Sequence, residues 1–159
     1  MLARDASPPA PLFGPAAARD ALQREAEQYV ARAFTMTRRA RALVANDRVA
    51  RLALLGRQRD RVAAHLARYQ RFKHSRIFDP VVAHGPASSR IVARTMKVDC
   101  FHLGETFTAY HARWRHLSTD EWSTYRRDMI DTVDLLHRSM EAELRAIRQL
   151  LMISGFYAH

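Results

Sequence analysis

The chain has 159 residues, with 26 Lys and Arg against 16 Asp and Glu and a formal net charge of +10. This length predicts one domain whose apolar core is large enough to fold without a disulfide or a metal. The single cysteine excludes an internal disulfide and a thiolate-rich zinc or iron–sulfur site, and no apolar run is long enough to span a membrane. We therefore expect a cytoplasmic protein with no membrane partner.

Residues 1–15 hold four of the six prolines, and we interpret them as a mobile Pro/Ala-rich leader. Asp5 and two prolines occupy positions where a secretory signal needs an apolar stretch. Residues 16–155 contain few helix breakers and carry apolar side chains every three or four positions. This spacing predicts that they form one helical domain.

Four helices are predicted in this domain. The first covers residues 15–44, and the second covers residues 48–78, where Pro80 ends or kinks it. The third covers residues 89–115. The fourth begins at a Ser-Thr-Asp-Glu capping box and covers residues 118–152. Four amphipathic helices of this length, joined by short loops, predict an all-α, up-down-up-down four-helix bundle.

Polar residues on the apolar faces are the candidates for a functional site, because helical bundles build their chemistry from side chains that project between facing helices. Lys73 lies four residues after Tyr69 on the second helix. Asp99 interrupts the apolar stripe of the third helix, and His137 lies at the edge of the stripe of the fourth. We predict a polar core network of these four residues, with a buried ion pair between Lys73 and Asp99, because an unpaired buried charge is costly.

Two stretches of the chain resemble the hemerythrin-like, HHE-type cation-binding domains. Residues 66–80 read Leu-Ala-Arg-Tyr-Gln-Arg-Phe-Lys-His-Ser-Arg-Ile-Phe-Asp-Pro. They are similar to that family's second helix, which places a His, a carboxylate one turn later and an aromatic–Pro ending there. His137 and Glu141 resemble the family's second such motif. The resemblance covers roughly residues 16–152 and implies a hemerythrin-like bundle, in a family that holds two irons for oxygen, nitric oxide or redox sensing.

The iron ligands that this resemblance implies transfer incompletely. The family's first-helix His has no counterpart, because the first predicted helix contains no histidine. Its second-helix His and carboxylate fall on Tyr69 and Lys73, or with a shift of one residue on Gln70 and His74. A protonated Lys does not ligate iron, and its charge repels a cation beside it. We therefore predict a bundle without a cofactor, in which the polar core network replaces the diiron centre.

An alternative interpretation keeps a metal. The family's third-helix His falls on Asp99 or His102, and only His137 and Glu141 match the family outright. Together with nearby His and acidic residues, these positions offer enough nitrogen and oxygen donors for one iron, zinc or manganese ion. The candidate ligands in this alternative are His74, Asp99, His102, Glu105, His137 and Glu141.

The positive charge is concentrated in the first helical hairpin. Residues 28–78 carry a net charge of +11, whereas residues 118–143 carry −4. The basic hairpin suggests nucleic acid as a partner, although few aromatic side chains interleave with the arginines. The opposite charges also favour neutralisation between adjoining helices, or self-association. The anion-binding candidates are Arg38, Arg39, Arg41, Arg48 and Arg51.

The sequence contains no Gly-rich phosphate loop, paired-cysteine motif or nucleophile elbow. Cys100 is expected to have a raised pKa beside Asp99 and to act as a small packed residue. We predict a non-enzymatic regulatory or interaction module that binds a protein partner or a second copy of itself. The alternatives are an iron-binding hemerythrin-like sensor and a nucleic-acid-binding protein.

Overall fold

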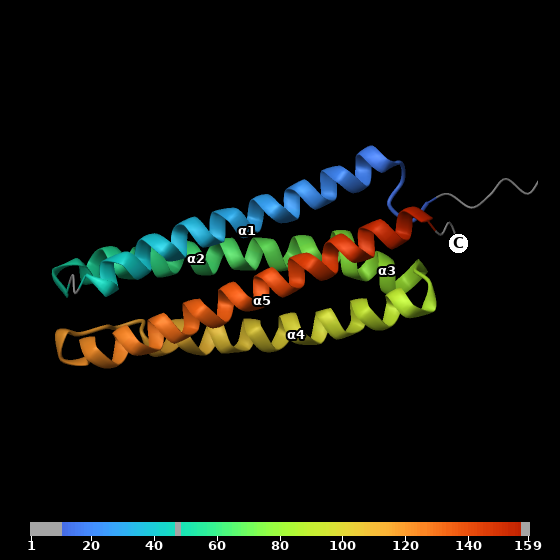
Figure 1. The fold of residues 1–159 in the computed structure, drawn as a ribbon. Helices are drawn as coiled ribbons and strands as arrows, with labels where there is room; N and C mark the ends of the chain where they lie inside the picture. The colour runs from blue at the N-terminus through green and yellow to red at the C-terminus, as the bar shows by residue number, and fades with distance from the viewer. Residues whose placement is uncertain (1–10, 47–48, 157–159) are drawn as a thin grey trace, which may run out of the picture.

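A computed structural model describes residues 11–46 and 49–156 of the chain. Four long helices run side by side along the molecule (Figure 1). They are α1 (Ala16–Ala45), α2 (Leu52–Lys73), α4 (Ala87–Arg113) and α5 (Trp122–Phe156).

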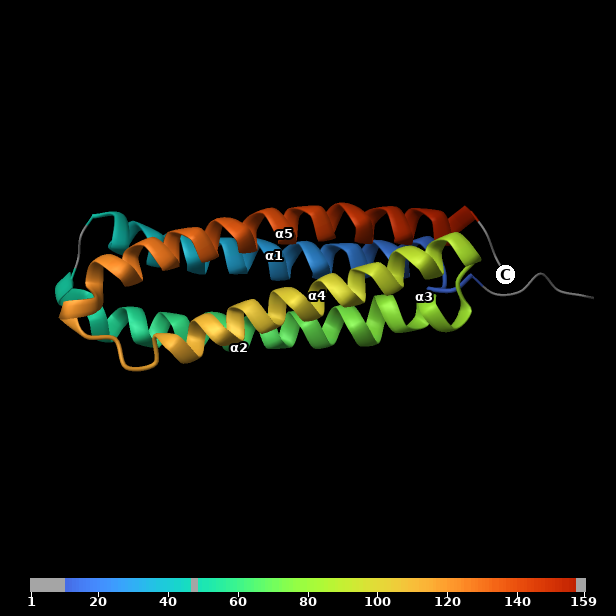
Figure 2. The same ribbon diagram turned by 90° about the horizontal axis from the view of Figure 1, so that it is seen from below.

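Each long helix packs against two others, α1 against α2 and α5, and α4 against α2 and α5. Seen from below, α1 and α5 form one layer and α2 and α4 the other (Figure 2). The all-α four-helix bundle predicted from the apolar periodicity is therefore confirmed. Among the described residues, no helix is both long enough and apolar enough to cross a membrane.

Short elements connect the long helices. A 3-10 turn, η1 (Val49–Arg51), precedes α2, and a second one, η3 (Thr119–Glu121), precedes α5. At η3, the predicted capping box is present, with Ser118 and Glu121 bonded reciprocally through their side chains and backbone. This box satisfies amide groups that would otherwise lack partners at the start of the last helical segment.

The second predicted helix extends further than expected. Instead of ending or kinking sharply at Pro80, the chain passes through a π-helical turn, η2 (His74–Phe78), into the short helix α3 (Asp79–His84). In η2 the N–H of Asp79 donates to the carbonyl of His74, five residues earlier. We relate this wider turn to Pro80, because proline lacks an N–H and its ring crowds the carbonyl of a regular α-helical turn.

The predicted leader is described only in its last part. Its residues 1–10 lie outside the described residues. Leu12 and Phe13 are partly buried and pack against the core. Gly14 follows them with a φ of +75°, a conformation that glycine adopts without steric cost. This end of the leader is therefore part of the folded bundle.

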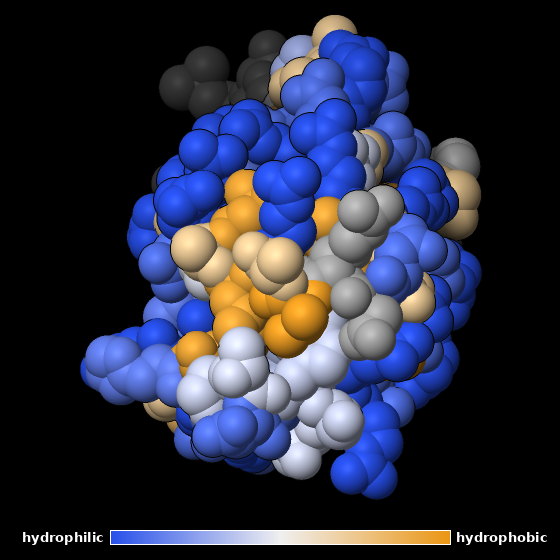
Figure 3. Space-filling view, turned by 90° about the vertical axis from the view of Figure 1, so that its left-hand side faces the viewer, coloured by the Kyte–Doolittle hydropathy of each residue, from blue (hydrophilic) through white to orange (hydrophobic). Residues whose placement is uncertain are grey.

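Buried apolar side chains form two clusters along the bundle. The first includes Tyr69, Phe78 and Met140, and the second includes Trp114 and Tyr125. Figure 3 looks onto the end of the molecule where α1 leads to η1, and shows an apolar surface with hydrophilic side chains above it and to its left. The elements at this end contribute three partly buried side chains to the second cluster, those of Leu43, Leu52 and Leu117.

Two glycines test how closely the backbone packs at the end of α3 and within α2. A Cβ added to Gly85, at the end of α3, would lie 2.6 Å from the carbonyl oxygen of Val81. We expect Gly85→Ala to lower the free energy of unfolding by about 1–2 kcal/mol. Gly56 in α2 is the matched control, because the nearest atom to its added Cβ is 3.8 Å away. Gly56→Ala should raise stability by up to about 1 kcal/mol, since alanine favours helix. Urea unfolding followed by circular dichroism measures both changes, and effects of the same sign would contradict this account.

Candidate functional site

An ion pair lies inside the bundle between α2 and α5. Lys73 and Glu143 are each 5% exposed, and the Lys73 Nζ lies 2.6 Å from the Glu143 Oε1. Lys73 lies one turn after Tyr69, and Glu143 lies three residues after Met140, so both occupy the buried faces of their helices. Taking two charges out of water is costly, and their close pairing offsets much of that cost.

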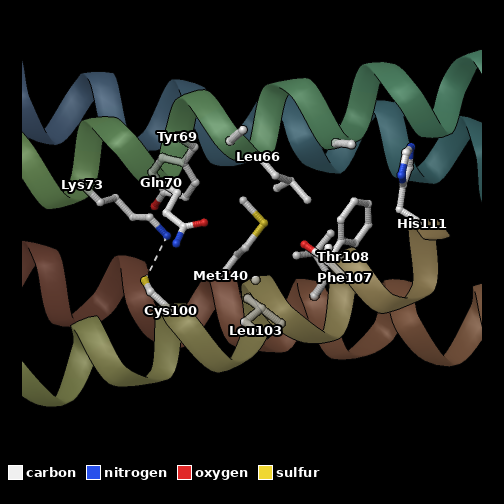
Figure 4. A pocket seen from close by; sticks show the side chains of 14 residues that line it. Leu66, Tyr69, Gln70, Lys73, Cys100, Leu103, Phe107, Thr108, His111 and Met140 are labelled. Carbon is white, nitrogen blue, oxygen red and sulfur yellow. Dashed lines mark hydrogen bonds between the residues drawn. The ribbon is translucent and has the colours of Figure 1, made fainter.

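Cys100 of α4 joins this pair and brings a third helix into contact with it. Its Sγ donates to the Glu143 Oε2 at 2.5 Å. The same Sγ accepts a hydrogen bond from the Lys73 Nζ at 3.2 Å, which Figure 4 shows as a dashed line. The Lys73 ammonium also lies 4.2 Å from the centroid of the Tyr69 ring, in a cation–π arrangement. We call Tyr69, Lys73, Cys100 and Glu143 the core polar cluster.

Burial keeps the weakly acidic groups of this cluster protonated. It raises the pKa of the Cys100 thiol to about 12, against the opposing effect of the Lys73 charge. Burial and the nearby Glu143 carboxylate raise the pKa of Tyr69 well above its usual range. The Tyr69 hydroxyl is buried and has no hydrogen-bond partner within the described part of the chain. The cluster therefore holds one cation, one carboxylate and two neutral groups.

This arrangement corrects the predicted pairing of Lys73 with Asp99. Asp99 is exposed on α4, and the next residue, Cys100, occupies the buried position instead. His137 also takes no part in the cluster. It faces α1, where its Nε2 lies 2.6 Å from the Thr37 Oγ1. Of the predicted network, only Tyr69 and Lys73 come together.

The structure does not bring the six candidate metal ligands together. His102 and Glu105 are exposed on α4, with 3.7 Å between the His102 Nδ1 and the Glu105 Oε2. Glu141 is exposed on α5, and His74 is half-buried, with its ring in a T-shaped contact with the ring of Phe78. Within residues 11–46 and 49–156, no group of three or more His, Cys, Asp and Glu side chains is placed to hold a metal ion.

A cavity of about 170 Å³ adjoins the core polar cluster between α2 and α4. Several of the residues that line it are small, among them Ala63 and Ala67 of α2 and Gly104 of α4. Figure 4 shows Lys73 toward one end of the cavity and His111 at the other. The lining between these ends is mostly apolar, so the cavity suits a small apolar molecule better than an ion.

The anion-binding candidates do not converge on one site. Arg41 of α1 lies 3.4 Å from Asp134 of α5, an ion pair of the kind expected from the opposite charges of these helices. Arg39 and Arg51 line an open surface depression. Arg48 lies outside the described residues. The described candidates are all exposed, namely Arg38, Arg39, Arg41 and Arg51.

Glu143 and Cys100 are the members of the core polar cluster that sequence reasoning missed. Glu143 lies three residues after Met140 and four before Ile147, which is the spacing of the buried stripe of α5. That spacing is a usable signal of burial, although Glu143 also belongs to the residues 118–143 whose net charge of −4 suggests an acidic helix. Cys100 was correctly expected to be packed and to have a raised pKa, although the main cause is burial.

Fold and site together define an all-α four-helix bundle whose core holds an ion pair between α2 and α5, to which a cysteine of α4 is hydrogen-bonded. No family model matches the sequence, and neither a curated protein nor a solved structure is significantly similar to it.

The ion pair predicts an asymmetric response to mutation. Glu143→Leu leaves the Lys73 ammonium unpaired in the core, and we expect it to lower the free energy of unfolding by about 3 kcal/mol or more. The double variant Lys73→Met/Glu143→Leu should recover much of this loss, because no charge is stranded. Lys97→Ala is the control, since it breaks the exposed Lys97–Asp79 pair and should cost under about 1 kcal/mol. Urea unfolding measures all three, and a double variant no more stable than Glu143→Leu would contradict the account.

Three histidines predict a loss of stability on mild acidification. Burial is the main cause that lowers the pKa of His65, His74 and His137 below the ordinary value. Below about pH 6.5 the unfolded chain therefore binds protons that the folded chain does not. The stability that the neutral rings contribute is present above this pH and is lost as the pH falls through the folded pKa values. We expect the free energy of unfolding to fall as the pH drops below about 6.5. Replacing the three histidines with Gln should reduce this slope, and an unchanged slope would contradict the assignment.

Proposed function

We propose that this chain is a non-enzymatic, hemerythrin-like helical bundle that acts as a regulatory or interaction module. In this proposal an ion pair occupies the part of the core where a metal-binding relative holds iron. The observation that carries the proposal is the position of Lys73, whose ammonium lies in the core beside Glu143 and Cys100. A protonated amine is not a metal ligand, and its charge opposes a cation bound nearby.

The chemistry of the core polar cluster supports a structural role. Cys100 is held as a thiol, whereas a reactive cysteine acts as a thiolate. Both oxygens of Glu143 accept hydrogen bonds, one from Lys73 and one from Cys100. Lys73, Cys100 and Glu143 thus hydrogen-bond to one another across three helices. Such a cluster fixes the packing of the helices and leaves the surface to carry the function.

The proposed hemerythrin-like character is supported by the order of the four helices and by residues 66–80. This stretch, on which the resemblance depends, spans the end of α2, the π turn η2 and the start of α3. Lys73 lies just before the π turn, and Tyr69 lies one turn earlier. The residues that would replace the family's second-helix ligands are thus both in the core polar cluster.

Metal analysis tests this proposal. Protein purified from iron-replete cells should contain only substoichiometric iron, zinc or manganese by elemental analysis. Addition of Fe(II) under nitrogen, followed by air, should produce no oxo-bridged absorption band. The variant Lys73→Met/Glu143→Leu is a useful control, because it removes the repelling charge without adding a ligand. Stoichiometric iron in the wild-type protein, together with such a band, would overturn the proposal.

A further inference from the structure

The outward face of α4 carries apolar side chains that the bundle leaves in water. Ile91, Val98 and Phe101 are 64%, 54% and 58% exposed. The opposite face of the same helix is buried through Ala93 and Cys100. One apolar face is enough to pack a helix into a bundle. A second apolar face, rimmed by polar residues, is typical of a surface that another protein covers.

These apolar residues belong to a regular series. Five exposed positions follow one another along α4 in alternating steps of three and four residues, which is the heptad spacing of a seam between two helices. We call this series the α4 seam. Its members are Ile91, Arg94, Val98, Phe101 and Glu105.

The α4 seam is complementary to itself when two copies run in opposite directions. A two-fold axis midway between Val98 and Phe101 places Val98 of one copy opposite Phe101 of the second copy. The same axis places Arg94 of one copy opposite Glu105 of the second copy. Because the interface is two-fold symmetric, each of these pairings occurs twice. Apolar contacts thus lie at the centre, with opposite charges on either side.

The charges of the seam also select the direction of packing. In a parallel arrangement Arg94 would oppose Arg94 of the second copy, and Glu105 would oppose Glu105, so like charges would repel. The antiparallel arrangement replaces both repulsions with attraction. We propose that this chain forms a symmetric homodimer in which the α4 seams of two copies pack against each other antiparallel. The occupant of the exposed apolar face is therefore a second copy of the chain.

This dimer deepens the proposed function, because it names the partner of the interaction module. The two proposals depend on different parts of the molecule and fail separately. A chain that stays monomeric overturns the dimer and leaves the metal-free core as it is. Stoichiometric iron in the core overturns the proposed function and leaves the dimer interface untouched.

Sedimentation equilibrium of the full chain tests the dimer through its charges. Wild-type protein should show a monomer–dimer equilibrium. Arg94→Glu places like charges opposite Glu105 and should weaken dimerisation by at least about tenfold. The double variant Arg94→Glu/Glu105→Arg reverses both charges, keeps them complementary and should restore dimerisation. Both side chains are exposed, so the fold is retained, as circular dichroism can check. Arg145→Glu, an equal charge change at an exposed position of α5, is the control and should have no effect.

Two further variants test the apolar centre of the seam and its direction. Val98→Glu should abolish dimerisation, whereas Met152→Glu, at a position of α5 that is 59% exposed, should not. When Val98→Cys and Phe101→Cys proteins are mixed, disulfides should form faster between the two variants than within either. Buried Cys100 does not compete, because its pKa is raised to about 12. A wild-type chain that is monomeric at all concentrations, or a dimer that Arg94→Glu leaves unchanged, would overturn the proposal.

Discussion

The buried pair of Lys73 and Glu143 constrains the rest of the bundle more than any apolar contact does. An apolar side chain tolerates a small shift of its neighbour, but an ammonium ion in the core needs its carboxylate within hydrogen-bonding distance. The pair therefore fixes how far along α2 the helix α5 lies. Cys100 extends the same constraint to α4, because its thiol donates to the second oxygen of Glu143. Three of the four long helices are thus held in one register by a single cluster.

This constraint also shapes what surrounds the cluster. The charged groups of the cluster are paired with each other. The adjoining cavity between α2 and α4 is lined mostly by apolar side chains. On α4, Cys100 points into the core and the next residue, Phe101, points into water. The helix α4 thereby contributes Cys100 to the core polar cluster inside the bundle and Phe101 to the α4 seam on its outside. The inward contact sets which residues of α4 are left on the surface, and hence which apolar side chains of this helix lie in water.

Much of the fold was predictable because local signals and helical periodicity agree along most of the chain. The helix order, the capping box before α5 and the bundle arrangement all follow from such signals. The identity of the buried carboxylate that pairs with Lys73 does not follow from these local signals. Between Met96 and Leu103, both Asp99 and Cys100 fit a stripe of three- and four-residue steps. The two positions lie about 100° apart around the helix, but both keep the spacing of the stripe, so helical periodicity alone does not choose between them.

Local sequence was sufficient for the helices and for the conclusion that Lys73 lies on an apolar face, because these depend on neighbours within a few turns of one helix. The charge pattern likewise predicted attraction between the basic hairpin and the acidic fourth helix, and the pair of Arg41 with Asp134 is of that kind. The identity of the carboxylate that meets Lys73 depended on contacts across 70 residues of chain. It was decided by the rotation and sliding of α4 and α5 against α2, quantities that arise only when the helices pack together.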